Sequence, residues 1–187
     1  MDILAPTYAA FSPPGNRELV ATTGFFDGVH LGHFAVLRRV LELAREQGKD
    51  SAVVTFWPHP RVILHQDSNK VRLLHSLDEK KQRLQRLGID HVLVLPFTPA
   101  FAQLSPAQFV KEYLHRQFRI TTLVAGYDHH LGANAGADYE QLRQIGKAIN
   151  MAVEYVGEIK DDTGQVTVSS TKIREALAQG DTGAANQ

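Results

Sequence analysis

The sequence predicts a single α/β domain built on a parallel sheet. Strand-like and helix-like segments alternate along the chain, which is typical of repeated βα units joined by right-handed crossovers. The composition agrees, because 187 residues with 43% hydrophobic content can bury one full core. In such sheets ligands bind in the crevice at the carboxyl ends of the strands. A functional site is therefore expected in the segments that follow the strands.

The first βα unit is predicted by a buried strand followed by an amphipathic helix. Residues 19–23 (Leu-Val-Ala-Thr-Thr) are apolar enough for a buried strand. Residues 34–47 carry apolar side chains at helical spacing, with charged ones mostly on the opposite side, and Gly48 ends that helix. Residues 51–56 then suit a second strand.

A long connection precedes the next helix. Residues 58–74 are polar and irregular, and we expect a loop or flap there, which in a compact domain is often functional. The following helix is predicted to begin near Ser76, whose spacing to Glu79 suits a capping box, and to stop at Gly88. Residues 91–95 suit the third strand.

The second half of the chain repeats the pattern. A Ser-Pro start signal opens a helix over residues 105–118, and residues 121–125 suit a fourth strand. A helix over 138–150 and a fifth strand over 152–156 follow. Residues 159–168 are expected to form a loop or hairpin around Asp-Thr-Gly.

Charge and composition exclude several classes of function. Twenty basic and twenty acidic residues cancel, which gives no electrostatic case for nonspecific binding to nucleic acid or to an anionic membrane. The chain has no cysteine and no apolar run of membrane-spanning length. These features predict a cytoplasmic protein whose partners are small molecules, with neither a nucleic acid nor a membrane among them.

The most informative segment lies between the first strand and the first helix. It reads Gly-Phe-Phe-Asp-Gly-Val-His-Leu-Gly-His over residues 24–33. His30 and His33 lie near a helix N-terminus, where free N–H groups and the helix dipole favour an anion. Dense glycines allow a ligand to approach the main chain closely. The alternative, a tight turn with one capping histidine, does not explain the paired histidines, so the segment predicts a phosphate site with two additional donors.

A cluster of hydroxyl groups precedes the last short helix, which is predicted to begin at Ser170 or Thr171. Ser169, Ser170 and Thr171 are followed by Lys172 and Arg174. A Ser-Ser-Thr run before a helix is most often only a cap. Together with the histidine turn, it becomes a second phosphate-binding element.

Four motifs resemble, in order, those of the FMN adenylyltransferase (FAD synthetase) module of bacterial bifunctional riboflavin kinase/FAD synthetases, within the HxGH nucleotidylyltransferase superfamily. They are the turn at 24–33, Thr-Phe-Trp-Pro-His-Pro at 55–60, Gly-Tyr-Asp at 126–128 and Ser-Ser-Thr-Lys-Ile-Arg at 169–174. The resemblance covers nearly the whole chain. It implies a Rossmann-like nucleotidylyltransferase fold over residues 1–187, with a small inserted loop or flap region.

The resemblance also implies an activity and the residues that carry it. The expected reaction transfers AMP from ATP to FMN by in-line attack on the α-phosphate, giving FAD and pyrophosphate. Mg²⁺ is expected to be held mainly by the nucleotide, with no metal site built by the protein. The residues expected to be catalytic are His30, His33 and Arg174. Those expected to bind ATP are Gly24, Phe25, Phe26, Asp27, Gly32, Gly126, Ser169, Ser170, Thr171 and Lys172. Those expected to bind FMN are Phe56, Pro58, His59, Pro60 and Asp128.

Two departures from the family pattern stand out. His129 and His130 replace an aromatic and a basic residue, and with Asp128 they suggest a metal cluster by composition, but adjacent residues of an extended segment point in different directions and form no ligand set. The chain stops at Gln187, where the family continues into a β-barrel riboflavin kinase domain. We therefore expect a chain truncated before that domain and no kinase activity from it.

Two alternatives stay open at this point. Another HxGH transferase would act on a cytidylyl, pantetheine or nicotinamide substrate, although the motifs at 55–60 and 126–128 argue against it. A nucleotide-binding regulatory module without turnover is the second.

Overall fold

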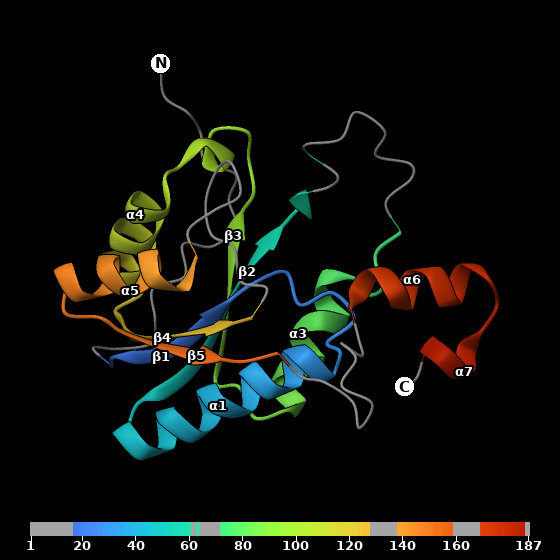
Figure 1. The fold of residues 1–187 in the computed structure, drawn as a ribbon, viewed down its shortest axis with the longest axis horizontal. Helices are drawn as coiled ribbons and strands as arrows, with labels where there is room; N and C mark the ends of the chain where they lie inside the picture. Colours follow the sequence, from blue (N-terminus) through green and yellow to red (C-terminus); the bar gives the residue numbers. More distant parts are fainter. Residues whose placement is uncertain (1–16, 61–62, 64–71, 128–137, 159–168, 186–187) are drawn as a thin grey trace.

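The computed structural model describes residues 17–60, 63, 72–127, 138–158 and 169–185. They form a five-stranded sheet in the order β3-β2-β1-β4-β5, and every neighbouring pair of strands is parallel (Figure 1). The strands are β1 (Leu19–Thr23), β2 (Asp50–Trp57), β3 (His91–Pro96), β4 (Ile120–Gly126) and β5 (Ala152–Val156). The predicted α/β class and parallel sheet are confirmed.

Helices cover both faces of the sheet (Figure 1). Helices α1 (Leu31–Gln47) and α3 (Leu77–Arg86) pack on one face, where their buried side chains join Val20, Val53 and Val124 in one core cluster. On the other face lie the short helix α4 (Pro106–Gln108), the π-helical segment η3 (Phe109–Gln117) that continues it, and α5 (Tyr139–Ala148). A 3₁₀ turn, η2 (Phe101–Gln103), precedes α4, and α6 (Ser170–Ala178) and α7 (Thr182–Ala185) follow the sheet.

Strand β1 lies at the centre of the molecule. Because β2 and β4 pair with its two edges and helices cover both faces, each of its residues is at most 3% exposed. Leu19 and Ala21 face the cluster that includes η3, and Val20 faces α1. Whatever follows Thr23 is therefore held at the ligand-binding edge of a rigid sheet.

The predicted elements agree with the structure, apart from their ends. The capping box at Ser76 and Glu79 is present, and Gly48 ends α1 in a left-handed conformation with φ of 63°. Helix α1 begins at Leu31, three residues before the apolar pattern of 34–47, and His30 caps it with its side chain, as the alternative of one capping histidine expected. The helix expected over 105–118 is α-helical only at its start, and its remaining turns are wound as a π-helix. The hairpin expected at 159–168 lies outside the described residues, as does much of the flap expected at 58–74.

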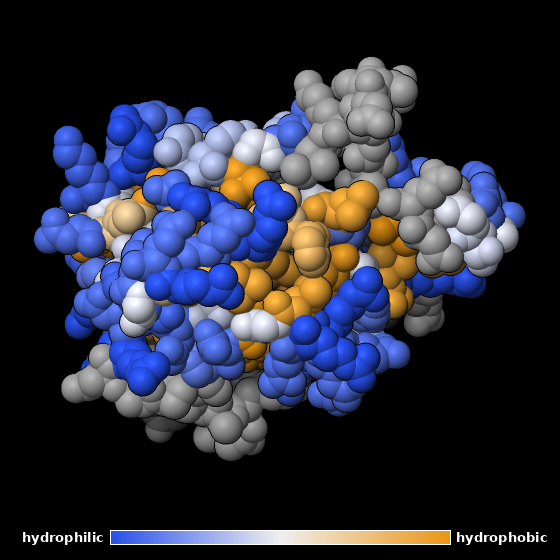
Figure 2. Space-filling view, turned by 90° about the horizontal axis from the view of Figure 1, so that it is seen from below, coloured by the Kyte–Doolittle hydropathy of each residue, from blue (hydrophilic) through white to orange (hydrophobic). Residues whose placement is uncertain are grey.

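The surface is not uniformly polar. Figure 2 shows a face on which hydrophilic side chains surround a central area of apolar ones. Among the described residues, the large apolar side chains that are exposed are Phe25, Leu31, Phe34, Tyr127, Tyr155 and Leu177. Among the helices that the structure describes, none is both long and apolar enough to cross a membrane.

Candidate active site

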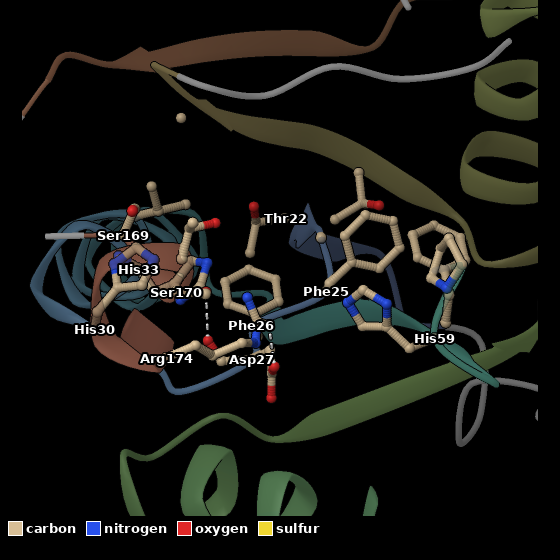
Figure 3. Close-up of a pocket in the computed structure, with 17 residues that line it drawn as sticks. Thr22, Phe25, Phe26, Asp27, His30, His33, His59, Ser169, Ser170 and Arg174 are labelled. Atoms are coloured by element: carbon tan, nitrogen blue, oxygen red, sulfur yellow. Dashed lines mark hydrogen bonds and ion pairs between the residues drawn. The ribbon is translucent and has the colours of Figure 1, made fainter. Parts of the chain in front are cut away.

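A cavity of about 360 Å³ opens at the carboxyl end of the sheet, between the starts of α1 and α6 (Figure 3). Most of the predicted site residues line it: Gly24, Phe25, Phe26, Asp27, His30, His33, Phe56, His59, Pro60, Gly126, Ser169, Ser170, Thr171 and Arg174. Thr22, Thr23 and Val36 line it as well and were not predicted. The structure thus joins four motifs that are spread over the whole sequence.

Four predicted residues are not among those that line the cavity. Gly32 lies in the first turn of α1, where a methyl group would approach the His30 ring to 3.3 Å, so this glycine makes room for the imidazole. Lys172 is exposed on α6, and Pro58 follows Trp57 through a cis peptide bond. Asp128 lies outside the described residues, with His129 and His130.

The turn that leads into α1 has an unusual backbone. Phe26, Gly28 and Val29 have φ of 49°, 86° and 42°, a conformation that non-glycine residues seldom adopt. At Gly28 the positive φ disfavours any other residue, and a Cβ there would lie 2.6 Å from a methyl group of Leu74, which would have to move. Phe26 and Val29 are buried and anchor the turn to the core. Strained residues that are held in place by packing are characteristic of binding sites.

The two histidines lie against each other at the start of α1. Their rings are stacked with centroids 3.7 Å apart, and Nδ1 of His30 accepts a hydrogen bond from the His33 backbone N–H at 3.4 Å. Burial, helped by the charge on His30, lowers the pKa of His33 to about 3. His33 is therefore neutral at physiological pH. Its Nδ1 is buried without a hydrogen-bond partner in the part of the chain that the structure describes.

Asp27 is the point at which the turn, the 72–75 segment and α6 meet. Its carboxylate, which is 3% exposed, accepts hydrogen bonds from the backbone N–H groups of Leu74 at 3.0 Å and His75 at 3.2 Å. It also accepts one from Nη2 of Arg174 at 2.5 Å (Figure 3). Its backbone carbonyl accepts one from the Ser170 hydroxyl at 2.7 Å. Burial raises the pKa of Asp27, but the Leu74 N–H and the Arg174 guanidinium outweigh it, and the net shift is downward. Asp27 therefore carries its charge and holds three protein groups.

The same segments are tied a second time. The Gly28 N–H donates to Nδ1 of His75 at 3.1 Å, and Nε of Arg174 donates to the carbonyl of Arg72 at 2.9 Å. Lys80 of α3 is buried, 2% exposed; burial lowers its pKa and the nearby Asp27 carboxylate opposes that shift. The turn at 24–33 is thus tied to the 72–75 segment and α6 by a network of charged and hydrogen-bonded groups.

The other end of the cavity is aromatic. The Phe25 ring, 38% exposed, lies 5.0 Å from the His59 ring and 5.5 Å from the Phe56 ring. Phe56 is itself buried among Phe101 and Phe109 of the core. Figure 3 places Phe25 and His59 on one side of Thr22, and His33, Ser169 and Arg174 on the other. The cavity therefore has a polar end and an aromatic end.

The start of α6 combines capping with cavity lining. The Ser169 hydroxyl accepts the Lys172 backbone N–H at 3.3 Å, the capping role expected of such a cluster. Ser169, Ser170 and Thr171 also line the cavity, so the N-termini of both α1 and α6 face the same space. In the described residues there is no group of three His, Cys, Asp or Glu side chains that could hold a metal ion.

Comparison with known proteins gives a consistent result. The FAD synthetase family profile matches residues 12–172. A bifunctional riboflavin kinase/FMN adenylyltransferase of Listeria monocytogenes is 36% identical over 168 residues, covering 90% of this chain and 52% of the relative. A FAD synthetase of the same organism is 32% identical over 165 residues, covering 88% of this chain and 65% of the relative. The chain thus spans about half the length of the bifunctional relative.

A solved structure shares the fold. The crystal structure of a protein described as a macrolide-efflux protein from Streptococcus pneumoniae matches with a TM-score of 0.79 and 28% sequence identity, covering 91% of this chain and 55% of that chain. This likeness supports the arrangement of sheet and helices described above.

Proposed function

The chain belongs to the FAD synthetase family, and on that premise we propose that it transfers the AMP group of ATP to FMN, releasing FAD and pyrophosphate. The observation that carries the proposal is the shape of the cavity, which joins two helix N-termini at one end to an aromatic wall at the other. A triphosphate fits the first and an isoalloxazine ring fits the second.

The polar end would hold the triphosphate. The N-terminus of α1, His30 and His33 would donate hydrogen bonds to oxygens of the α-phosphate, and the Ser169, Ser170 and Thr171 hydroxyls would bind the β- and γ-phosphates. Because its pKa is about 3, His33 would act as a neutral N–H donor. Its orphaned, buried nitrogen supports this role, since such an atom is satisfied when a ligand fills the cavity.

Arg174 is oriented before any ligand binds. Two of its nitrogens, Nε and Nη2, are held by the Arg72 carbonyl and the Asp27 carboxylate. Nη1 has no hydrogen-bond partner among the residues that are described, and Arg174 lines the cavity. We infer that this remaining edge of the guanidinium contacts phosphate oxygens. A lysine could not make both sets of contacts, because it presents one charged nitrogen in place of a fork.

The aromatic end would hold the flavin. Phe25, which the sequence assigned to ATP binding, lies against His59, and we therefore assign it to the flavin instead; both offer ring faces, and Pro60 extends the wall. An oxygen of the FMN phosphate would then attack the α-phosphorus of ATP, and the bond from that phosphorus to the pyrophosphate would break. The positioned donors stabilise the charge that develops on the α-phosphate, without a covalent intermediate on the protein.

Mg²⁺ would enter with the nucleotide. Among the described residues, Asp27 supplies the single carboxylate that lines the cavity, and its oxygens already accept three protein donors. The residues therefore suit a cation that is bound by phosphate oxygens and water, which is the usual state of Mg²⁺ in nucleotide sites. When bound, Mg²⁺ supplies charge neutralisation to the triphosphate.

The direct test is to incubate the purified chain with ATP, Mg²⁺ and FMN and to measure FAD and pyrophosphate. Riboflavin, which lacks the phosphate group, and phosphate monoesters other than FMN replace FMN in parallel reactions, and CTP replaces ATP. Equal turnover of another phosphate monoester would favour a different nucleotidylyltransferase. ATP binding without any product would favour a regulatory nucleotide-binding module.

A further inference from the structure

Two buried hydroxyl groups at the end of β1 have no hydrogen-bond partner. Thr22 and Thr23 are 1% and 3% exposed, and within the described part of the chain nothing hydrogen-bonds to either Oγ1 atom. Both residues line the cavity. Because buried hydroxyls are nearly always paired, and an unpaired one destabilises the fold, two adjacent examples need an explanation.

Other buried threonines of the sheet are paired. Thr122 of β4 is 2% exposed, and its hydroxyl donates to the side-chain oxygen of Gln47 at 3.0 Å. Thr55 of β2 is fully buried, and its hydroxyl donates to the Phe25 carbonyl at 3.4 Å. The fold thus satisfies threonine hydroxyls elsewhere in the same sheet and leaves Thr22 and Thr23, which border the cavity, without partners.

The two hydroxyls belong to opposite faces of the sheet. Thr22 is in register with Val53, which packs on the α1 face. Thr23 is in register with Val54, which shares the other face with Phe56. Figure 3 places Thr22 between the His33 and Ser169 end of the cavity and the Phe25 and His59 end. The hydroxyls therefore lie at the junction of the two proposed substrate halves, one toward each face.

We propose that Thr22 and Thr23 are substrate-binding residues. The Thr22 hydroxyl hydrogen-bonds ATP on the α1 face, and the Thr23 hydroxyl hydrogen-bonds FMN on the opposite face. Each hydroxyl has almost no exposed surface, so it reaches a substrate atom by rotating about χ1 toward the cavity that its residue lines. A hydroxyl can both donate and accept, which suits phosphate and sugar oxygens alike. The assignment of ATP and FMN to the two residues rests on the proposed function.

Thr22→Val tests the proposal because valine has the shape of threonine without the hydroxyl. Removing an unpaired buried hydroxyl removes the free-energy cost of burying it. The thermal midpoint of the ligand-free protein should therefore rise, by about 2–4 °C for each kcal/mol of that cost. The same change should weaken ATP binding about tenfold, as loss of a hydrogen bond to a charged ligand does. Titration calorimetry with ATP and Mg²⁺, which needs no turnover, measures the second effect.

Thr122→Val is the matched control. It removes a paired hydroxyl of equal burial outside the cavity, so it should lower the thermal midpoint and leave ATP binding unchanged. Thr22→Ser keeps the hydroxyl and should keep ATP binding near the wild-type level, which identifies the hydroxyl as the cause of the weaker binding in Thr22→Val. Thr23→Val should raise the KM for FMN about tenfold and leave that for ATP nearly unchanged.

ATP affinity at the wild-type level in Thr22→Val, or equal loss in Thr22→Val and Thr22→Ser, would overturn the role of Thr22. A lowered thermal midpoint in Thr22→Val would also count against it, because it would mean that the hydroxyl already has a partner. If the wild-type chain binds ATP but forms no FAD, the proposed function fails while the calorimetric test of Thr22 still stands.

Discussion

Replacing Asp27 by asparagine should loosen the attachment of α6 to the turn at residues 24–33. The substitution keeps the shape of the side chain and removes its charge. Of the two carboxylate oxygens, one faces the N–H groups of Leu74 and His75, and the other faces Leu74 and Nη2 of Arg174. An amide turns one of these oxygens into a donor, so at least one donor loses its acceptor in either orientation.

The magnitude follows from burial and charge. The side chains of Asp27 and Arg174 are 3% and 17% exposed, so solvent screens their hydrogen bond far less than it screens a surface pair. A hydrogen bond to a charged group contributes about 1.5–3 kcal/mol. The free energy of unfolding should fall by about 2–3 kcal/mol, which for a chain of this size lowers the thermal midpoint by about 4–12 °C. Turnover should fall as well, because Arg174 loses the contact that orients it.

The loss should depend on pH with a definite sign. Because the pKa of Asp27 is lowered on folding, its stabilisation is present above the unfolded pKa of about 3.9 and is lost as pH falls through the folded pKa. Urea unfolding from pH 7 down to pH 3 measures the difference between wild type and Asp27→Asn, which should shrink below about pH 4. Glu140→Gln is the control, since its pair with Arg143 is exposed and should make no measurable difference. Equal stability of Asp27→Asn and wild type at pH 7, or a difference that is the same at pH 3, would refute the reasoning.

Three further changes have distinct expected outcomes. His33→Ala should lower kcat about 10²–10³-fold with a smaller effect on ATP affinity, as for loss of one oriented donor. The pKa of His33 is about 3 in the folded protein, so the unfolded chain binds a proton more readily. The wild type should therefore become less stable as pH falls below about 6.5. Phe25→Ala and His59→Ala should raise the KM for FMN and leave that for ATP nearly unchanged, and an equal rise for both substrates in steady-state kinetics would indicate a folding defect. Gly146→Ala should lower the free energy of unfolding by about 1–3 kcal/mol, because its methyl group would lie 2.5 Å from a backbone oxygen, whereas Gly157→Ala meets nothing within 4 Å and should melt like wild type.

Local signals in the sequence were sufficient for most of the fold. Apolar runs located the strands, and the Ser76 to Glu79 spacing located the start of α3, because both depend on neighbouring residues alone. Helix α1 starts three residues before its apolar pattern because the His30 side chain accepts the His33 N–H, a capping role that the sequence suggested only as the alternative to a phosphate site. The π-helical winding of η3 likewise leaves no trace in the spacing of its apolar residues.

The site was predictable as a set of motifs but not as a network. The residues of each motif could be named, yet the contact between Asp27 and Arg174 joins positions 147 residues apart. Lys80 lies in α3, whose other charged residues are solvated, and its burial depends on packing beneath the turn at residues 24–33. Thr22 and Thr23 carry no distinguishing pattern, since two threonines at the end of an apolar strand are ordinary β-sheet residues. Their missing partners become visible only when all neighbours are in place.

The position of β1 has a practical consequence for mutagenesis. The five residues of β1 lie in the middle of the core, and Thr22 and Thr23 also line the cavity, so a substitution at the end of this strand alters folding and ligand binding together. A deep mutational scan scored on FAD production alone would report this strand as uniformly intolerant. Dividing each variant's activity by the amount of folded protein in the cell would separate the two contributions. After that correction, variants at Leu19, Val20 and Ala21 should show near-normal activity per folded molecule, whereas variants at Thr22 and Thr23 should not.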